Sequence, residues 1–353
     1  MNRLLALAAA STFTQALPGF HFQFPRDHAS HPGYKTEWWY YTGHLAEPKG
    51  RTFGFELTFF RFGMTRAPLG PSRWRFGDLY LAHFAVTDEH QQRFSFFDRL
   101  NRPGLGLADA NPEHFDVHNG TWRARELPDG RHHLRAREGD LAIDLVLKSL
   151  KPPVIHGHDG VSQKADCDGC ASHYYSLTRL ETSGILTLGR ERLPVHGTSW
   201  MDHEISSNQL TKEQVGWDWF SLQLSDGAEL MLYRLRLANG QVEPKSSGTY
   251  VRPDGSWVDL PLGTWSADGT STWTSPRSKG AYPSGWRVKV PQEQLDLTVT
   301  PTVQDQELAT GGPTAATYWE GSSKVAGTHA GKPVTGDGYV ELTGYAAGGR
   351  PNL

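Results

Sequence analysis

Two carboxylates and an imidazole occupy consecutive positions in Trp200-Met-Asp-His-Glu204, the strongest candidate for chemistry in this sequence. In an extended strand the side chains alternate, so Asp202 and Glu204 would share one face and His203 would take the other. Only one of these two sets can therefore face a binding cavity. Carboxyl and imidazole groups transfer protons near neutral pH when their surroundings tune them, so the segment predicts general acid–base catalysis.

A second segment, Gly336–Thr343, resembles Gly197–Glu204 and keeps an acid as Glu341, but it has Leu342 in place of the histidine. A purely structural pair would have no reason to add an imidazole to one copy alone. His203 is therefore the first choice for proton transfer. The alternative is a histidine that is hydrogen-bonded in a seam between two domains.

Glu37 begins an aromatic run, Trp38-Trp-Tyr-Tyr41. Aromatic neighbours would remove water from this carboxyl and raise its pKa, so that it could donate a proton at neutral pH. The alternative is an ion pair between Glu37 and an arginine, Arg61 or Arg234. We expect a ligand site to be lined by side chains of this run and of a related run further along the chain, although aromatic residues are also common in cores. These side chains are Trp38, Tyr40, His44, Trp217, Asp218, Trp219 and Tyr233.

Signatures of familiar hydrolases and metal enzymes are missing from the sequence. Gly197-Thr-Ser-Trp-Met201 lacks the second glycine of a GxSxG nucleophile elbow, and no HExxH motif occurs. Asp27-His-Ala-Ser-His31 offers two histidines, but a proline-flanked loop is a poor metal signature. Glycine loops that hold phosphates or dinucleotides are also missing. We therefore expect no metal and no cofactor, which leaves cofactor-free chemistry or binding alone.

The two cysteines, Cys167 and Cys170, lie in a loop rich in Asp and Gly. In an exported protein this spacing predicts a small loop disulfide. One alternative is a redox-active pair, which would need a helix N-terminus to stabilise a thiolate. The other is a zinc site completed by nearby histidines, His156, His158 or His173.

Antiparallel β-structure must position these groups. Apolar residues alternate with others in Leu141–Lys148 and Leu295–Thr300, which is typical of half-buried strands. The chain has 38 glycines and 22 prolines, and it lacks long stretches in which apolar residues recur with the period of a helix. We expect such sheets to close into up-and-down barrels, because closure removes their exposed edges. Hairpin turns are predicted where glycine, which tolerates positive φ, follows Asn or Asp: Asn119-Gly120, Asp129-Gly130, Asp226-Gly227, Asn239-Gly240 and Asp254-Gly255.

The aromatic run has an altered copy. When Leu45 is set on Leu224, Trp38 coincides with Trp217 and Tyr40 with Trp219. The strands that follow, Phe53–Arg61 and Ala228–Arg236, then correspond as well, and the two halves join near Ser207. The pattern predicts one fold used twice, as two packed barrels with an apolar cavity. Chance similarity between aromatic strands is the alternative, because strands favour these residues.

Length, charge and the N-terminus limit the function classes. A chain of 353 residues is long enough for two domains, and its formal charge of −3 has no block of one sign, which argues against nucleic acid or anionic membranes as partners. Arg3, the apolar run Leu4–Ala10 and small residues to Ala16 predict a signal peptide, residues 1–16, and hence a secreted or periplasmic protein. No other stretch could span a bilayer, and the signal lacks a lipobox cysteine. The alternative is a cytosolic protein with an apolar first strand.

Five motifs between Phe20 and Tyr345 resemble, in order, the AttH-like "predicted secreted hydrolase" branch of the carotenoid 1,2-hydratase (CrtC-type) superfamily. The resemblance implies two consecutive lipocalin-like barrels, here residues 20–208 and 209–353, with export and a ligand site at or near the barrel interface. Characterised members of the superfamily include hydratases that add water to a C=C bond of a carotenoid, a hydratase that acts on an isoflavonoid, and fungal pericyclases of the Diels–Alder type. The motifs are His31-Pro-Gly-Tyr-Lys-Thr-Glu-Trp-Trp-Tyr-Tyr-Thr-Gly-His44, Ala171-Ser-His-Tyr-Tyr-Ser176, Trp200-Met-Asp-His-Glu204, Gly216-Trp-Asp-Trp-Phe-Ser-Leu-Gln-Leu224 and Gly338-Tyr-Val-Glu-Leu-Thr-Gly-Tyr345.

The expected function is acid–base chemistry on a hydrophobic small molecule, terpenoid or lipid-like, such as hydration of a C=C bond. Asp202 or His203 would transfer the proton, and aromatic faces such as that of Trp219 would stabilise the resulting cation. Ile205 and Arg234 depart from the pattern of the hydratases, which argues against a carotenoid substrate. The rival function is a non-catalytic lipocalin-like carrier, or a lipid-handling partner of an envelope ABC transporter.

Overall fold

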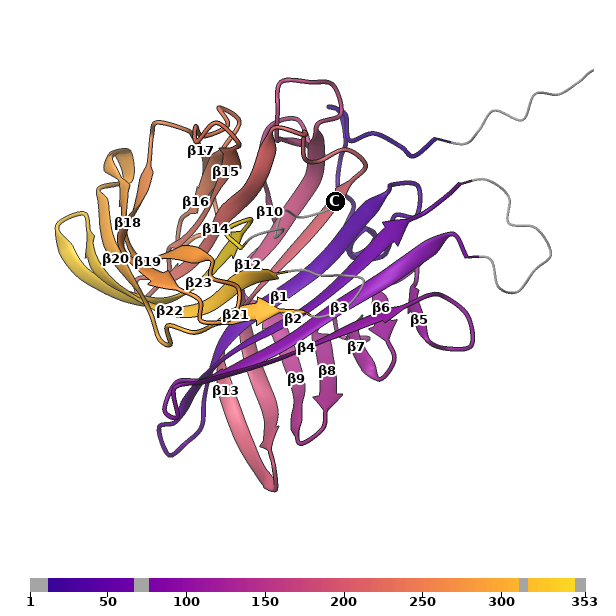
Figure 1. The fold of residues 1–353 in the computed structure, drawn as a ribbon, viewed down its shortest axis with the longest axis horizontal. Helices are drawn as coiled ribbons and strands as arrows, with labels where there is room; N and C mark the ends of the chain where they lie inside the picture. Colours follow the sequence, from indigo (N-terminus) through magenta and orange to yellow (C-terminus); the bar gives the residue numbers. More distant parts are fainter. Residues whose placement is uncertain (1–11, 67–75, 311–316, 347–353) are drawn as a thin grey trace, which may run out of the picture.

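The computed structural model describes residues 12–66, 76–310 and 317–346, so most of the predicted signal peptide lies outside the described residues. The chain forms two antiparallel sheets, each curled into a nearly closed barrel, and the barrels lie side by side (Figure 1). The prediction of an all-β fold with two packed lipocalin-like barrels is confirmed.

The first barrel is a sheet with 13 strands among the described residues, in the order β4-β3-β2-β1-β13-β12-β9-β8-β7-β6-β5, with β10 and β11 paired to β12. Its strands are β1 (Thr36–Ala46), β2 (Thr52–Gly63), β3 (Asp78–Asp88), β4 (Arg93–Asn101), β5 (Ala108–Ala110), β6 (Asp116–Asn119), β7 (Trp122–Glu126), β8 (His132–Glu138), β9 (Leu141–Ser149), β10 (Val154–Ile155), β11 (Ser162–Gln163), β12 (Ala171–Leu188) and β13 (Glu191–Ser206).

The second barrel has 10 strands in the same described ranges, in the order β17-β16-β15-β14-β23-β22-β20-β19-β18, with β21 paired to β22. Its strands are β14 (Gln214–Leu224), β15 (Glu229–Leu237), β16 (Ser247–Val251), β17 (Trp257–Pro261), β18 (Ser266–Thr274), β19 (Ala281–Val290), β20 (Leu295–Pro301), β21 (Glu307–Ala309), β22 (Thr317–His329) and β23 (Lys332–Thr343).

Helical structure is limited, in the described part of the chain, to two 3-10 turns, η1 (Arg26–His28) and η2 (Pro291–Glu293). None of the helices described there is long and apolar enough to cross a membrane. The segment before β1 packs on the first barrel, and its Ala16 is buried with Val161 and Ala171. Cleavage after Ala16 stays a prediction.

Each barrel encloses its own apolar core, as the alternating patterns require. In β9 the alternating residues Leu141, Ile143, Leu145 and Leu147 are buried in the core of the first barrel. In β20, Leu295, Leu297 and Val299 are buried in the core of the second. The predicted turn glycines have positive φ, for example 60° at Gly120. Period-two burial and turn chemistry therefore account for both barrels.

The strand registers agree with the internal repeat. In the first barrel Tyr40 of β1 pairs with Asp202 of β13, and in the second Trp219 of β14 pairs with Glu341 of β23. Tyr40 and Trp219 coincide in the sequence repeat, so Asp202 and Glu341 occupy equivalent positions.

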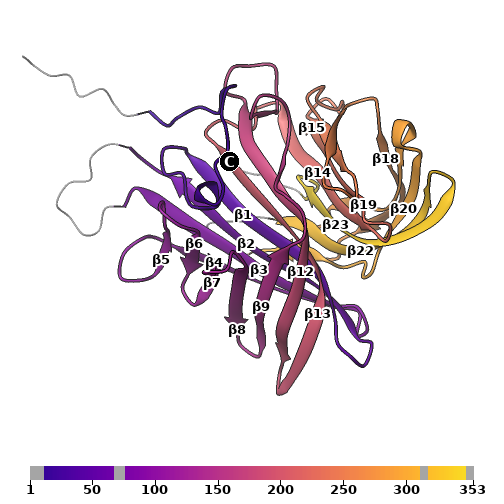
Figure 2. The ribbon, with the colours of Figure 1, turned by 180° about the vertical axis from the view of Figure 1, so that it is seen from behind.

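The two barrels pack through the outer faces of their equivalent strands, which Figure 2 shows from behind. Tyr40 and its counterpart Trp219 touch each other edge to face, with ring centroids 5.2 Å apart. A buried carboxylate of the second barrel, Glu229, accepts hydrogen bonds from Lys151 Nζ at 2.6 Å and Arg179 Nε at 2.5 Å, both from the first barrel. The apolar residues of this interface are Tyr40, Tyr174, Trp200, Trp219, Met231, Tyr233, Leu235 and Tyr339.

Candidate functional site

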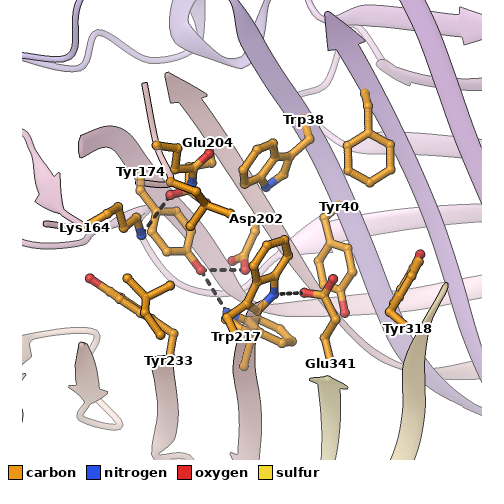
Figure 3. Close-up of a pocket in the computed structure, with 15 residues that line it drawn as sticks. Trp38, Tyr40, Lys164, Tyr174, Asp202, Glu204, Trp217, Tyr233, Tyr318 and Glu341 are labelled. Atoms are coloured by element: carbon orange, nitrogen blue, oxygen red, sulfur yellow. Dashed lines mark hydrogen bonds and ion pairs between the residues drawn. The ribbon is translucent and has the colours of Figure 1, made fainter. Parts of the chain in front are cut away.

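A pocket lies between the two barrels and is partly open to solvent (Figure 3). Four of its side chains carry charge or can ionise as acids or amines: Lys164, Asp202, Glu204 and Glu341. The remaining lining is mostly aromatic and apolar: Trp38, Tyr40, Phe60, Tyr174, Gln209, Leu210, Trp217, Trp219, Tyr233, Leu235 and Tyr318.

Asp202 lies in the pocket wall and is held by three donors. Tyr174 Oη donates to it at 2.7 Å and Trp200 Nε1 at 2.6 Å, and Ser176 Oγ donates as well. Burial raises the pKa of Asp202 to about 7, against the lowering effect of these hydrogen bonds. The carboxyl is therefore poised to give or take a proton near neutral pH.

Glu204 lies two residues after Asp202, on the same face of β13, and has a cationic partner. Lys164 Nζ lies 2.9 Å from Glu204 Oε1 and 4.0 Å from the centre of the Tyr233 ring. Burial alone would lower the pKa of Lys164, but the charge of Glu204 outweighs it and the pKa is raised. The pair places two opposite charges near Asp202, and the negative charge of Glu204 contributes to the raised pKa of Asp202.

Glu341 lines the pocket from the second barrel, and Trp217 Nε1 donates a hydrogen bond to it at 2.8 Å. Burial and the charges of nearby acids raise the pKa of Glu341 to about 8, against the lowering effect of the hydrogen bond from Trp217. Behind it, Glu320 pairs directly with Glu341 across β22 and β23 and accepts a hydrogen bond from Tyr40 Oη at 2.5 Å. Burial also raises the pKa of Glu320 well above its usual range. Protonated carboxyls explain how two acids can lie opposite each other in a buried sheet.

His203 points to the opposite face of β13, into the first barrel, and does not line the pocket. Its Nε2 lies 3.0 Å from Glu37 Oε1, and Arg61 Nε donates to Glu37 Oε2 at 3.1 Å. The expected raised pKa of Glu37 is wrong: burial favours a rise, but hydrogen bonds from His203 and His31 and the charge of Arg61 hold the pKa well below the usual range. The alternative prediction, an ion pair between Glu37 and Arg61, is confirmed.

Of the expected ligand-binding residues, five line the pocket: Trp38, Tyr40, Trp217, Trp219 and Tyr233. Asp218 does not, because it is buried with Arg234 Nη2 at 2.7 Å and Arg236 Nε at 3.0 Å. His44 lies instead in a smaller space between the barrels, beside Tyr339.

Comparison with known proteins shows which family the chain belongs to. A family model described as AttH-like matches residues 15–345, nearly the whole chain. The chain belongs to the AttH-like family. The crystal structure of an AttH protein from Nitrosomonas europaea is 32% identical, with a TM-score of 0.86, and the match covers 95% of this chain and 100% of that one. No curated protein sequence matches.

More distant solved structures share the fold of this AttH-like chain. Kievitone hydratase from Nectria haematococca is 16% identical, with a TM-score of 0.71 and coverage of 94% of this chain and 96% of that one. CghA, solved with Sch210972, is 14% identical, with a TM-score of 0.55 and coverage of 88% and 89%. At these identities the likeness concerns the fold.

Eight pocket residues were not predicted as site residues, among them Lys164, Tyr174 and Glu341. The sequence does carry a signal for Glu341, because the repeat keeps an acid at the position of Asp202. The prediction relied instead on the difference between the copies, His203 against Leu342. Lys164 sits in an irregular loop, where no repeat or period points to it.

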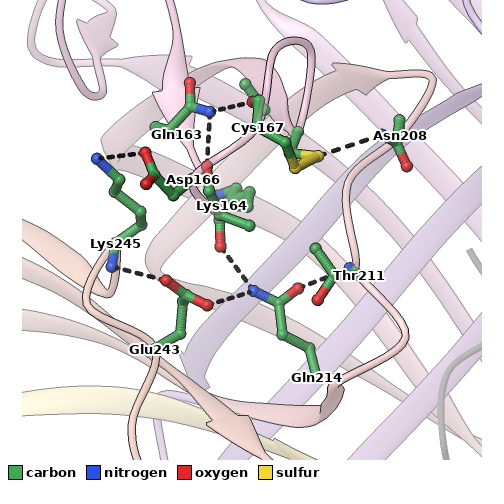
Figure 4. The surroundings of a disulfide bond; sticks show 12 residues. Gln163, Lys164, Asp166, Cys167, Asn208, Thr211, Gln214, Glu243 and Lys245 are labelled. Carbon is green, nitrogen blue, oxygen red and sulfur yellow. Dashed lines mark hydrogen bonds and ion pairs between the residues drawn. A yellow bond between two sulfur atoms is a disulfide. The ribbon is translucent and has the colours of Figure 1, made fainter.

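Cys167 and Cys170 form a disulfide, as the sequence predicts, with their Cα atoms 5.4 Å apart. Lys164 lies three residues before the small loop that this bond closes (Figure 4). Gln214 Nε2 donates to the Lys164 carbonyl at 2.6 Å, and Asn208 Nδ2 lies 3.2 Å from Cys170 Sγ. The linker between the barrels and the disulfide loop thus support the Lys164 end of the pocket together.

Reduction of this disulfide is expected to lower the free energy of unfolding by about 2 kcal/mol, the chain-entropy value for so short a loop. Urea denaturation with and without dithiothreitol measures the change. A double variant, Cys167→Ser with Cys170→Ser, serves as control and should not respond to the reductant. Equal stability of the oxidised and reduced wild type would contradict the prediction.

Glu341→Gln is expected to flatten the pH dependence of stability. The folded protein keeps a proton on Glu341 up to about pH 8, whereas the unfolded chain releases it at its ordinary pKa, so rising pH destabilises the wild type. The variant should gain roughly 2–4 kcal/mol relative to the wild type between about pH 5 and about pH 9. Urea denaturation across that range tests this, and parallel curves for the two proteins would refute it.

Proposed function

We propose that the protein binds a hydrophobic small molecule between its barrels and carries out cofactor-free acid–base chemistry on it, of which hydration of a C=C bond is the leading case. The observation that carries the proposal is the convergence of Asp202 and Glu341, two carboxyls with raised pKa, on one aromatic pocket. A terpenoid or lipid-like alkene matches such a lining.

The chemistry balances with these groups alone. A protonated carboxyl, Asp202 or Glu341, gives its proton to one alkene carbon, and the π bond breaks to leave a cation on the other. The faces of Trp38, Trp217 and Trp219 stabilise that cation through their quadrupoles. Water then forms the new C–O bond and loses a proton to the carboxylate, which restores the acid. The relationship to the fold of kievitone hydratase supports this choice of reaction.

The test is incubation of the protein with a panel of acyclic isoprenoid and unsaturated fatty-acid substrates in ¹⁸O-labelled water. Mass spectrometry should find a product heavier by one molecule of that water. The double variant Asp202→Asn with Glu341→Gln should bind the same compounds, seen as quenching of tryptophan fluorescence, and form no product. A matched control, Asp109→Asn on the exposed side of edge strand β5, should keep the activity.

The rival function, a non-catalytic carrier or a lipid-handling partner of an envelope ABC transporter, uses the same aromatic pocket. It needs affinity without proton transfer. Binding of the panel with no product from the wild type, and unchanged binding by the double variant, would favour the carrier and reject the enzyme.

We also propose that the protein acts outside the cytoplasm, secreted or in the periplasm. The apolar N-terminal run and the disulfide between Cys167 and Cys170 support this, because disulfides persist in oxidising compartments. Cell fractionation with an N-terminal sequence determination of the mature protein tests both export and cleavage after Ala16.

A further inference from the structure

A second set of chemically active side chains lies in the first barrel, outside the pocket. His31, from the loop after η1, meets Glu37 of β1 and His203 of β13. His31 Nδ1 lies 2.9 Å from Glu37 Oε1, and His203 Nε2 lies 3.0 Å from the same oxygen. All three side chains are buried, and the three ligand-type atoms lie within 4.8 Å of one another.

The other nitrogen of each histidine is held by an outer partner. His31 Nε2 lies 3.2 Å from Asp27 Oδ1 and 3.0 Å from Arg26 Nη1. His203 Nδ1 lies 3.1 Å from Tyr175 Oη, which in turn lies 2.6 Å from His28 Nδ1. Tyr175 can donate to His28 and accept from His203.

His31 Nδ1 and His203 Nε2 are the atoms turned toward Glu37 Oε1. Without a metal, protons lie between these nitrogens and the carboxylate, and a metal ion would take their place. Metal-binding histidines characteristically use their second nitrogen in this way, with a carboxylate or another acceptor behind it.

The charged groups around the cluster balance one another. Glu37 Oε2 accepts from Arg61 Nε, and Arg61 Nη1 also binds Asp78 at 3.0 Å. Two further arginines, Arg26 and Arg66, reach Asp27 and Asp78 from the partly exposed rim. The backbone N–H of His31 donates to both oxygens of Glu37, which fixes the carboxylate between the two imidazoles.

We propose that His31 Nδ1, Glu37 Oε1 and His203 Nε2 bind a divalent transition-metal ion, with zinc the best match to two imidazoles and one carboxylate. Zinc–ligand bonds of about 2.0–2.2 Å put neighbouring ligand atoms about 3–3.5 Å apart, so the two nitrogen–oxygen separations of 2.9 and 3.0 Å need to open by only a few tenths of an ångström. Binding displaces a proton from His31 Nδ1 to solvent as the metal–nitrogen bond forms.

The ion would fasten the N-terminal segment to β1 and β13. His31 is the one ligand of the three outside the barrel strands, so the metal joins that segment to the sheet. His203 and Asp202 lie on opposite faces of β13, which separates this site from the pocket. His28, the other histidine of this loop, contacts Tyr175 instead, and one partner of His31 in the cluster, His203, is distant in the chain.

The test uses the full chain without a histidine tag, stripped with a chelator and titrated with Co²⁺ and then Zn²⁺. We expect one Co²⁺ per chain with the visible absorption of a low-coordinate nitrogen and oxygen site, its displacement by Zn²⁺, and a higher melting temperature with Zn²⁺. Glu37→Gln and His203→Gln should each weaken binding at least about tenfold, and Asp27→Asn, behind His31, by about 10–100-fold. His156→Gln, a buried histidine that contacts Thr249 and Ser176 instead, is the control and should bind normally.

A wild type that shows only the spectrum of hydrated Co²⁺ and no calorimetric binding of Zn²⁺ would overturn the proposal. Equal affinity in Glu37→Gln, His203→Gln and the wild type would overturn it as well, because the ion would then lie elsewhere. If either variant fails to fold, the Co²⁺ spectrum and stoichiometry of the wild type still decide the matter.

Discussion

Asp202→Asn is expected to lower turnover of an alkene substrate by about 10²–10⁴-fold, the range for loss of a general acid. The amide keeps the shape of the side chain and can still be held by Tyr174, but it has no proton to transfer. Ligand affinity should change by less than about threefold, because the aromatic lining is untouched. Initial rates from product mass spectrometry and dissociation constants from fluorescence quenching give the two quantities.

The pH profile provides a second readout of the same residue. Asp202 has a pKa near 7 and Glu341 one near 8, so a rate that needs their protonated forms should fall as pH rises through that window. Asp109→Asn should leave both rate and profile unchanged. A wild-type rate in Asp202→Asn, with an unaltered profile, would remove Asp202 from the mechanism and leave Glu341 as the proton donor to test.

Arg61→Met is expected to destabilise the fold by about 3–5 kcal/mol, the cost of leaving a buried charge without its partner. Arg61 is 1% exposed, and its guanidinium binds Glu37, Asp78 and the carbonyls of His31 and Tyr34. Methionine fills similar volume but supplies no donor. Urea denaturation of chelator-treated protein measures the loss without interference from bound metal.

The exposed pair of Arg287 and Asp296 is the matched control. Arg287→Ala should cost at most about 1 kcal/mol, since solvent screens such a pair. A second variant, Arg61→Met combined with Glu37→Leu, should recover part of the stability because no charge is then left alone. If Arg61→Met costs no more than the control, Glu37 does not depend on this guanidinium.

The fold could be predicted from the sequence because its evidence is local. Alternation in β9 and β20 and glycines such as Gly120 and Gly227 specify strands and turns over a few residues. The repeat identified equivalent residues as well, and in the structure the register of β1 on β13 matches that of β14 on β23.

The site could be predicted only in part. Alternation correctly separated Asp202 and Glu204 from His203, but it cannot say which face meets a cavity, and that depends on where the second barrel docks. The pKa of Glu37 depends on Arg61, which lies 24 residues away in sequence and directly opposite in the neighbouring strand. Lys164 reaches the pocket from the irregular segment before the disulfide, whose path follows from long-range contacts.

The meeting of Tyr40 with its own counterpart Trp219 has a wider consequence. Contact between equivalent faces is the interface that a symmetric homodimer makes, in which both subunits offer the same patch. Identical subunits must place identical groups around such an interface. Joining the two copies in one chain lifts that restriction, so Asp202 and Glu341 can differ in length and in pKa while they serve one pocket. An unequal pair of acids is therefore something that this covalent pseudo-dimer can build and that an assembly of identical single barrels could not.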